Sequence, residues 1–427
     1  MAIGDIIVGL DIGASKVSCV IGQVNKFNEI EVIGHGMSKN ANVKKGKILD
    51  LQSTAKSIMR AIQSAEEVSE VSVNSAYVNI KGMNVRIEKM VVESDVEKPD
   101  DGMTINDIYE AYAKIQLATK IEQGEQIIDI IPNHYEINGR IYKEEPIGAF
   151  CKTFRIEVEV VIAEGEYIEQ VQKCLSMAGL KLDGLILETL ATSNIVLMPE
   201  EKQIGVILID VGAAHTDISV YKDSKLEFYT TLPVGGNHIT NDIALTLGIS
   251  DEEAEKIKKQ YNLAIKAMIT NDHDIKLHTK KTGDEKDSIV KCSDIVCIIE
   301  ARVKEIFQII KKISIDNGLT NKFDCVVLTG QGICNIIGAE ELAILMLKRK
   351  QVRVCSPKLI NIIKPQHTTV YGMVRYIATL GLSKHVSSDV ELITELGMKD
   401  KIFGGVSRFT SKIKNVFKRA KEKDREE

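Results

Sequence analysis

The chain has 427 residues, with 55 Lys and Arg against 60 Asp and Glu and a formal net charge of −5. Apolar residues make up 44 % and charged residues 27 %, as in ordinary soluble globular proteins. Because the net charge is slightly negative, we expect no nucleic-acid partner. The length is enough for two or more domains with their own cores. No window reaches the roughly 18 apolar residues of a membrane span, and we expect no signal peptide, because the first residues lack a basic stretch and a cleavage site.

Strand-like apolar runs alternate with segments of 3.6-residue periodicity along most of the chain. This alternation predicts an α/β architecture. The periodic segments predict helices at Ser53–Val68, Tyr167–Ala178, Asp251–Met268 and Asp294–Ile313.

Residues 84–165 have a different pattern. Strand-like runs surround a helix expected near Ile105–Thr119, and the Asn138-Gly139 pair predicts a tight hairpin turn. We therefore expect a small α+β subdomain inserted into the α/β frame. Residues 269–290 are polar, and we expect them to form an exposed excursion.

One pattern occurs twice. Residues 6–22, IIVGLDIGASKVSCVIG, read as a buried strand ending near Asp11, a glycine-containing polar turn and a second strand. Residues 204–221, IGVILIDVGAAHTDISVY, repeat this order with Asp210 in the same place. Two similar halves about 200 residues apart predict a duplicated fold around a central cleft.

The two Asp-x-Gly turns and a third glycine turn favour nucleotide binding. Glycine lets backbone N–H groups approach a ligand, and successive N–H groups in a turn suit phosphate. Asp11 and Asp210 would hold Mg²⁺, which prefers carboxylate, water and phosphate oxygens. The third turn, Gly330-Gln331-Gly332 before an expected helix, would accommodate the nucleoside. One Asp-x-Gly turn alone is a weak signal, for which an ordinary hairpin is the simpler interpretation.

The order of these segments resembles the superfamily of actin, heat-shock chaperone ATPases and sugar kinases. Over nearly all its length the chain is similar to the FtsA family of bacterial cell-division proteins. The most specific segment is TLPVGGNHITNDIALTLGISDEEAEKIK, residues 231–258. Three others also match: IIPNHYEINGRIYKEEPIGAF (130–150), CIIEARVKEIF (297–307) and VVLTGQGICNIIGAEELA (326–343).

The resemblance implies ATP and Mg²⁺ as cofactors. It implies phosphate-binding hairpins at Asp11–Lys16 and Asp210–Asp217, and a connecting helix that carries Glu188 as a candidate catalytic residue. The implied metal ligands are Asp11, Asp210 and Asp217. The implied nucleotide-binding residues are Gly13, Ala14, Ser15, Lys16, Gly212, Ala213, Ala214, His215, Gly235, Gly236, Asn237, Glu255, Lys258, Gly330, Gln331 and Gly332.

Simpler structural interpretations remain open for several of these residues. Glu255 and Lys258 stand three positions apart on an expected helix and are compatible with an exposed ion pair. Asn237 precedes a helix and is compatible with a cap, and the two glycines before it with shaping a turn. Glu188 is also compatible with a solvated position on its helix.

The sequence also departs from the superfamily pattern. Residues 212–215 read Gly-Ala-Ala-His where glycine and threonine are commoner, residues 330–332 replace a glycine triplet, and no proline follows the glutamate in residues 188–190. We therefore expect slow ATPase activity at most, with nucleotide acting as a ligand that favours one assembly state.

The resemblance implies a division into lobes, with an inserted subdomain like the SHS2 domain of its relatives. The expected parts are a first actin-like lobe at 1–83 and 166–200, the insertion at 84–165, a second lobe at 201–383 with a smaller subdomain at 237–320, a linker at 384–401 and an amphipathic helix at 402–420.

Residues 402–420 have the pattern of an interfacial membrane helix. At about 100° per position, one side carries Ile402, Phe403, Val406, Phe409, Ile413, Val416 and Phe417, and the other faces carry Arg408, Lys412, Lys414, Lys418 and Arg419. Residues 401–421 contain seven Lys or Arg and no Asp or Glu. This composition favours anionic lipid. A helix that docks on its own domain or on a partner is the alternative.

The function that the resemblance implies, together with the C-terminal pattern, is a membrane tether for cell division. Such a protein would bind ATP, self-assemble into filaments on the cytoplasmic face of the cell membrane at the division site, and bind FtsZ. The inserted subdomain would recruit later division proteins. A pilus-assembly component and a small-molecule kinase of the same superfamily are the alternatives, although we find no motif for a kinase's catalytic base.

Overall fold

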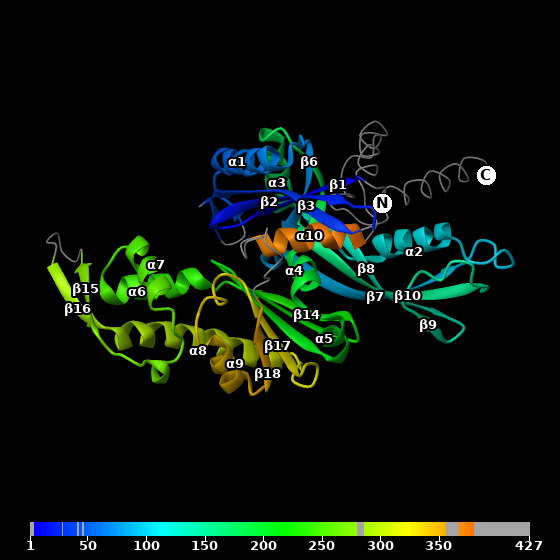
Figure 1. Ribbon diagram of the computed structural model, residues 1–427. Coiled ribbons are helices and arrows are strands. Elements are labelled where there is room, and N and C mark those ends of the chain that lie inside the picture. The colour runs from blue at the N-terminus through cyan, green and yellow to red at the C-terminus, as the bar shows by residue number, and fades with distance from the viewer. Residues whose placement is uncertain are drawn as a thin grey trace. The chain divides into compact units, whose positions relative to one another are not determined.

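The computed structural model describes residues 4–27, 29–40, 42–44, 47–279, 286–355 and 367–379. It divides into two compact units (Figure 1). The first comprises the described residues up to Ala191 together with those from Thr369, and the second is Thr192–Thr368. The division falls inside α4 (Glu188–Val196). None of the helices in these described ranges is long and apolar enough to cross a membrane.

A five-stranded sheet forms the centre of the first unit, in the order β11-β6-β1-β2-β3. Strands β1 to β3 are antiparallel neighbours, whereas β6 and β11 run parallel to β1. Strands β1 and β6 are buried along almost their whole length and most of their residues are apolar, as expected for a sheet covered on both faces. The bounds are β1 (Ile6–Ile12), β2 (Lys16–Val24), β3 (Ile30–Lys39), β6 (Ser75–Ile80) and β11 (Lys181–Leu187), with short elements β4 (Val43–Lys44), β5 (Lys47–Ile48) and η1 (Gly82–Asn84).

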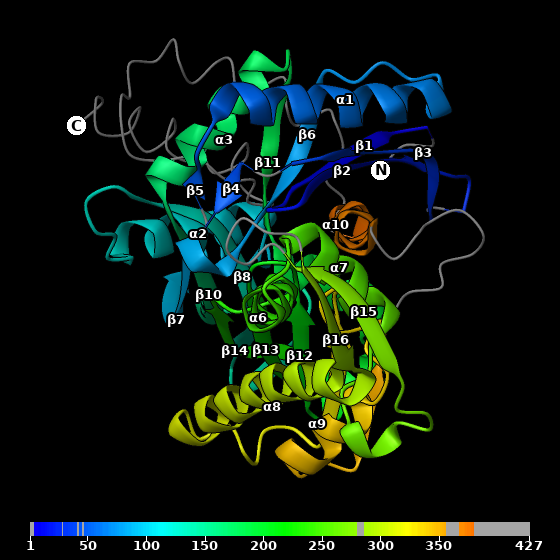
Figure 2. The ribbon, with the colours of Figure 1, turned by 90° about the vertical axis from the view of Figure 1, so that its left-hand side faces the viewer.

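Helices α1 (Leu51–Ser69) and α3 (Gly165–Met177) lie on one face of this sheet (Figure 2). Asp50 caps α1 by accepting a hydrogen bond from the Ser53 amide. A Cβ on Gly34 of β3 would lie 2.5 Å from the carbonyl oxygen of Ala65, so glycine lets α1 approach the strand closely. Both helices confirm the periodicity-based predictions to within two residues at each end.

Helix α10 (Thr368–Thr379) lies on the opposite face of the first sheet (Figure 2). Its residues Val370, Met373, Val374 and Ile377 are buried in one apolar cluster with side chains of β1, β2, β6 and β11. The sequence-based boundaries placed these residues in a second lobe ending at 383. Their apolar face instead packs on the first unit, which α10 rejoins after the chain has passed through the second.

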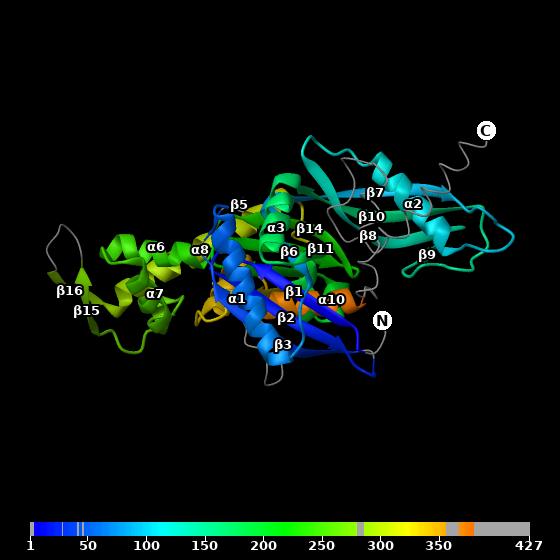
Figure 3. The ribbon, with the colours of Figure 1, turned by 90° about the horizontal axis from the view of Figure 1, so that it is seen from above.

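The inserted subdomain, expected at 84–165, has its own antiparallel sheet in the order β7-β10-β8-β9, with α2 against it (Figure 3). Asn138 and Gly139 both have positive φ between β8 and β9, which confirms the predicted tight turn. The expected α+β character is therefore confirmed. The bounds are β7 (Val85–Asp95), α2 (Ile105–Ala118), β8 (Glu125–Ile137), β9 (Arg140–Tyr142) and β10 (Thr153–Glu164).

The second unit contains a sheet of the order β14-β13-β12-β17-β18. Three antiparallel strands are followed by two strands parallel to the third, the same arrangement as β3-β2-β1-β6-β11 in the first unit. The repeat predicted from the two hairpins is therefore a duplicated sheet. The bounds are β12 (Val206–Val211), β13 (Thr216–Lys222), β14 (Lys225–Leu232), β17 (Cys325–Thr329) and β18 (Gln351–Val354).

The second unit differs from the sequence prediction in one helix and in one segment expected to be an exposed excursion. Helix α7 ends at Gln260 rather than Met268, because the next residues pair with a distant segment: the Ala264 amide donates to the Ile337 carbonyl. The expected polar excursion contains an antiparallel hairpin, β15–β16, whose Leu277 is buried. The bounds are α5 (Pro199–Ile204), α6 (Gly236–Leu247), α7 (Asp251–Gln260), η2 (Lys266–Met268), β15 (Asp274–Thr279), β16 (Lys286–Lys291), α8 (Cys292–Asp316) and α9 (Ala339–Leu347).

Candidate functional site

The first repeated hairpin joins β1 to β2 through a short, anchored turn. The Gly13 amide donates to the Lys16 carbonyl at 2.9 Å and closes the turn. Asn40 fixes it from the side, since its side chain donates to the Gly13 carbonyl and its amide to the Ser15 carbonyl. Ser15 at the tip is exposed, and Ala14 and Lys16 are half-buried. The turn is therefore held in shape while its tip stays accessible.

The second hairpin, between β12 and β13, closes in the same way. The Gly212 amide donates to the His215 carbonyl at 2.9 Å. The first two residues of α6 then attach to the turn, because the amides of Gly236 and Asn237 donate to the carbonyls of Gly212 and Ala213. Asn237 is thus the second residue of α6 and not its cap. Its amide and that of Gly236 are already used by the turn.

The three glycine turns of the second unit pack backbone against backbone. A Cβ on Gly332 would lie 2.6 Å from the Gly212 carbonyl oxygen, and one on Gly235 would lie 2.7 Å from the same atom. A Cβ on Gly236 would lie 2.9 Å from the Cα of Gly332. Gly330 has φ of +91°, which favours glycine. The fold therefore brings together five predicted positions and leaves no room for a side chain at most of them. These are Gly212, Gly235, Gly236, Gly330 and Gly332.

Ala214 and Gln331 are the remaining predicted turn residues of the second unit. Ala214 is half-buried and Gln331 is exposed. At these two positions the turns remain at least partly exposed, unlike the closely packed glycines.

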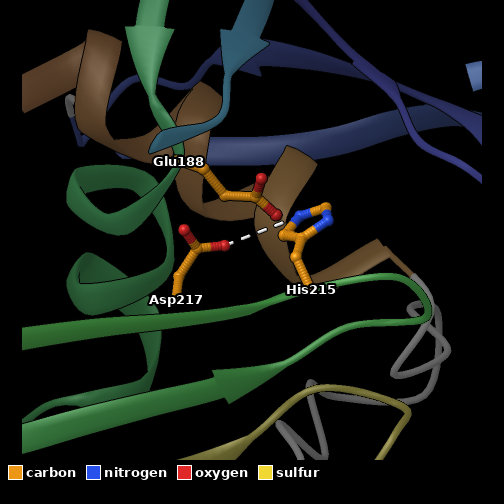
Figure 4. A group of neighbouring side chains, drawn as sticks. All are labelled: Glu188, His215 and Asp217. Carbon is orange, nitrogen blue, oxygen red and sulfur yellow. Dashed lines mark ion pairs between the residues drawn. The ribbon is translucent and has the colours of Figure 1, made fainter. Parts of the chain in front are cut away.

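The carboxylate of Asp217, labelled in Figure 4, is buried and has several side-chain partners. It accepts hydrogen bonds from the hydroxyls of Tyr229 and Thr231, both on β14. The His215 ring lies 3.7 Å from its other oxygen. Glu188, also labelled in Figure 4, belongs to the first unit.

Asp210 lies directly opposite Asp217 in the β12–β13 register, so both carboxylates are on the same face of the sheet. The hydroxyl of Thr192 donates to Asp210 at 3.5 Å. Burial, together with the charge of Asp210, raises the pKa of the Cys334 thiol to about 12. The end of β12 is therefore an acidic site within the second unit.

The carboxylates of the first unit have a lysine between them. Lys81 Nζ lies 3.3 Å from Glu188 Oε2 and 3.7 Å from Asp11 Oδ1. Asn79 donates to the same oxygen of Glu188 at 3.2 Å. Both acidic residues are 7 % exposed, so the solvated interpretation of Glu188 is wrong. Sequence analysis missed Lys81, although its position directly after a buried strand is the same signal that identified Asp11.

The residues at this edge of the first sheet fit a hydrated Mg²⁺ ion. Asp11 Oδ1 and Asn79 Oδ1 are buried and accept no hydrogen bond from the described residues. Buried acceptors are normally satisfied, and carboxylate and amide oxygens are ligands of hard cations and acceptors for their waters. Burial raises the pKa of the nearby Tyr167 hydroxyl to about 12; the charge of Lys81 opposes this shift, and the charge of Asp11 adds to it.

Glu255 and Lys258 form an ion pair of 2.6 Å on α7 that also reaches α6. The Lys258 ammonium donates to the Thr240 hydroxyl and the Gly236 carbonyl, and the Thr240 hydroxyl donates to Glu255. Burial disfavours ionised Glu255, but hydrogen bonds from Lys258 and Thr240 outweigh burial and lower its pKa. The pair is therefore partly buried beside the second hairpin, rather than an isolated surface pair.

The predicted linker at 384–401 and the predicted amphipathic helix at 402–420 lie outside the described residues. The membrane assignment therefore remains a prediction from sequence.

Comparisons with known proteins identify the family. The family model for cell division protein FtsA matches residues 207–372. The cell division protein FtsA of Pseudomonas aeruginosa is 31 % identical over 345 residues, which are 80 % of this chain and 80 % of that protein.

Two solved structures support the fold assignment. The PilM-PilN type IV pilus biogenesis complex has a TM-score of 0.61 at 16 % identity, covering 86 % of this chain and 97 % of that one. MreB5 of Spiroplasma citri bound to AMPPNP has a TM-score of 0.52 at 12 % identity, covering 92 % and 99 %. These structures show the actin-like fold. The sequence identity to P. aeruginosa FtsA, sustained over four-fifths of both chains, shows that this chain belongs to the FtsA family of cell division proteins.

Proposed function

We propose that this chain binds ATP with Mg²⁺, self-assembles on the cytoplasmic membrane and tethers FtsZ at the division site. The observation that carries nucleotide binding is the repeated hairpin. Each copy is closed by the same amide–carbonyl bond and stands at the end of a strand that carries an aspartate. Anchored turns of this kind suit phosphate. A protein of the same fold, MreB5, has been solved with AMPPNP, which supports the proposal.

In this proposal the accessible tip at Ala14–Lys16 contacts phosphate, and Asp11 and Asp210 are each a candidate ligand of Mg²⁺ or its waters. Bound Mg²⁺ would neutralise phosphate charge. The Lys258 ammonium, beside the Gly236 carbonyl, is the candidate contact to the nucleoside. The exposed Gln331 turn would lie next to that nucleoside.

Slow turnover fits the contacts of Glu188. Its carboxylate faces Lys81 and accepts a hydrogen bond from Asn79, so it is held by cationic and amide groups instead of being poised to accept a proton. We expect a hydrolysis rate far below the ~10 s⁻¹ typical of enzymes. Nucleotide would act mainly by favouring one assembly state.

Isothermal titration calorimetry with ATP tests the nucleotide proposal. Asp210→Ala should weaken binding about tenfold in Mg²⁺ and much less in EDTA, because the carboxylate acts through the metal. Glu252→Ala, an exposed acidic residue of α7, is the matched control and should leave affinity unchanged. Equal ATP affinity for Asp210→Ala and the parent chain in Mg²⁺ would falsify this assignment.

The membrane part of the proposal depends on the tail. Seven apolar residues at 402–417 would each contribute ~1.5–3 kcal/mol if fully buried, against ~1–2 kcal/mol per residue to order the backbone. One tail should therefore bind weakly, and a filament presenting many tails should bind far more tightly. Assembly and membrane binding would then reinforce each other.

Vesicle co-sedimentation across protein concentration tests the tether. Deletion of residues 402–427, or Phe409→Glu with Phe417→Glu, should abolish pelleting with anionic vesicles, and added salt should weaken it. A truncated chain that still pellets would show that another segment is the anchor. Co-sedimentation with FtsZ on the same vesicles tests the partner, and loss of FtsZ from the pellet with the truncated chain is the expected result.

A further inference from the structure

Lys81 occupies the space between the two buried carboxylates of the first unit. Its ammonium lies 3.3 Å from Glu188 and 3.7 Å from Asp11, and its side chain is 14 % exposed. Two carboxylates and one ammonium leave a formal charge of −1 in a largely buried place. No motif in the sequence assigns this lysine a role.

The strand order explains why these three charges meet. Strand β6 lies between β11 and β1 and runs parallel to both, so their carboxyl ends share one edge of the sheet. Ile80 of β6 pairs with Leu187 of β11. Lys81 directly follows Ile80, and Glu188 directly follows Leu187. Leu10 of β1 pairs with Val78, one residue before Asn79. Along this edge, in the order β11-β6-β1, the side chains are therefore those of Glu188, Lys81 and Asp11.

The lysine does not fully satisfy Asp11. The ammonium is 3.7 Å from Asp11 Oδ1, beyond hydrogen-bond distance, and this oxygen accepts no hydrogen bond from the described residues. Asn79 Oδ1, two residues before Lys81 on the same face of β6, is also buried without a donor. Two oxygens suited to a hard cation or its waters thus remain beside an ammonium that already neutralises part of the charge.

We propose that Lys81 is a tethered cation that competes with divalent metal for Asp11 and Glu188. A divalent ion held by Asp11 would lie within a few ångströms of the ammonium, where like charges repel strongly in a poorly solvated place. The nucleotide-free protein therefore binds Mg²⁺ weakly, and the metal enters together with the phosphates that compensate this repulsion. This inference rests on the proposed nucleotide site and adds to it the residue that sets its metal affinity.

Metal binding without nucleotide tests the competition directly. The full chain is titrated with Mn²⁺, followed by electron paramagnetic resonance of the free ion. Lys81→Met should bind one Mn²⁺ about tenfold or more tightly than the parent chain. Lys81→Arg retains the positive charge and should bind like the parent. Asp11→Asn in the Lys81→Met background should remove the gain, which locates the ion at this edge.

Lys81→Gln keeps a polar side chain and provides a second variant with the same expected gain. Mn²⁺ should also raise the melting temperature of either neutral variant more than that of the parent. If a neutral variant is unfolded without metal, recovery of its helical circular dichroism on adding Mn²⁺ supports the competition, and no recovery contradicts it. Unchanged or weaker Mn²⁺ binding by folded Lys81→Met and Lys81→Gln overturns the proposal. These outcomes are separate from nucleotide binding, since ATP is absent and its affinity is measured independently by calorimetry.

Discussion

The two repeated hairpins share their strand order and their turn hydrogen bond, yet the carboxylates beside them have different surroundings. Asp11 has a buried oxygen without a hydrogen-bond donor and an ammonium, that of Lys81, at 3.7 Å. The counterpart of Asp11 is Asp210; Asp217 stands opposite Asp210, where the first unit has Ser18 opposite Asp11. Asp217 accepts hydrogen bonds from the hydroxyls of Tyr229 and Thr231. The neighbouring groups come from different places in the two sheets: Lys81 directly follows β6, whereas Tyr229 and Thr231 lie on β14. The two units share one sheet arrangement, but Asp11 keeps a buried oxygen without a donor among the described residues, whereas Asp217, at a position that is a serine in the first unit, is hydrogen-bonded within its own sheet.

The largest expected difference between the repeats is their tolerance of a methyl group in the glycine turns. In the second unit, a Cβ on Gly332 would lie 2.6 Å from a backbone carbonyl oxygen, which can move only with its turn. In the first unit, a Cβ on Gly13 would lie 3.0 Å from the Lys16 carbonyl oxygen. Gly332→Ala should therefore cost at least ~3 kcal/mol of unfolding free energy and Gly13→Ala only ~1 kcal/mol.

Urea-induced unfolding followed by circular dichroism measures both glycine variants. If both variants lose the same unfolding free energy, the turns of the second unit relax as easily as the single turn of the first. In that case the close packing of the three turns would not constrain the second site.

The next largest effect should come from removing a hydrogen-bond donor from Asp217, which would leave it short of a partner, as Asp11 is. Thr231→Val removes a hydroxyl donor with little change in shape and leaves a buried carboxylate short of a partner, which should cost ~2 kcal/mol. Thr230→Val, on the opposite face of the same strand, is the matched control and should stay within ~0.5 kcal/mol. Comparable unfolding free energies for the two variants would show that Asp217 does not depend on its hydroxyl donors.

Two partly buried lysines sharpen the comparison further. Lys81 of the first unit faces two carboxylates, whereas Lys202 of α5 donates to the Ser193 hydroxyl and lies 5.2 Å from the centre of the Tyr221 ring. Burial lowers the pKa of Lys202 to about 8. An unfolded lysine keeps its proton up to about pH 10.4. Below about pH 8 the folded state therefore bears the full desolvation cost of the charged Lys202 ammonium. Between about pH 8 and 10.4 the lysine loses its proton in the folded state only, so the free energy of unfolding rises with pH.

Lys202→Met should accordingly stabilise the chain by ~1 kcal/mol at pH 7, the smallest of the three effects. The gain should disappear near pH 10.5, where the parent lysine is neutral in both states. Unfolding titrations of the parent and the variant at both pH values measure the difference. A gain that is the same at both pH values would mean that apolar packing, and not the buried charge, is responsible.

The elements that the sequence predicted well are governed by local patterns. Helix α2 follows its 3.6-residue periodicity, and the Asn138-Gly139 turn follows from two residues that tolerate positive φ. Helix α7 was predicted too long because its end depends on a backbone bond from Ala264 to Ile337, 73 residues further along the chain. The packing of α10 on the first sheet was likewise not visible, since an apolar helical face does not indicate which sheet it will cover.

The same division applies to the candidate site. The sequence by itself determined that Asp11 and Asp210 stand at the ends of buried strands before glycine turns, because apolar runs and glycine specify strand and turn locally. Only the tertiary structure decided that Lys81 lies between Asp11 and Glu188. These residues are distant in sequence, and parallel strands joined by long crossovers bring their carboxyl ends to one edge only when the strand order is β11-β6-β1. The charge balance of the site is a property of that order.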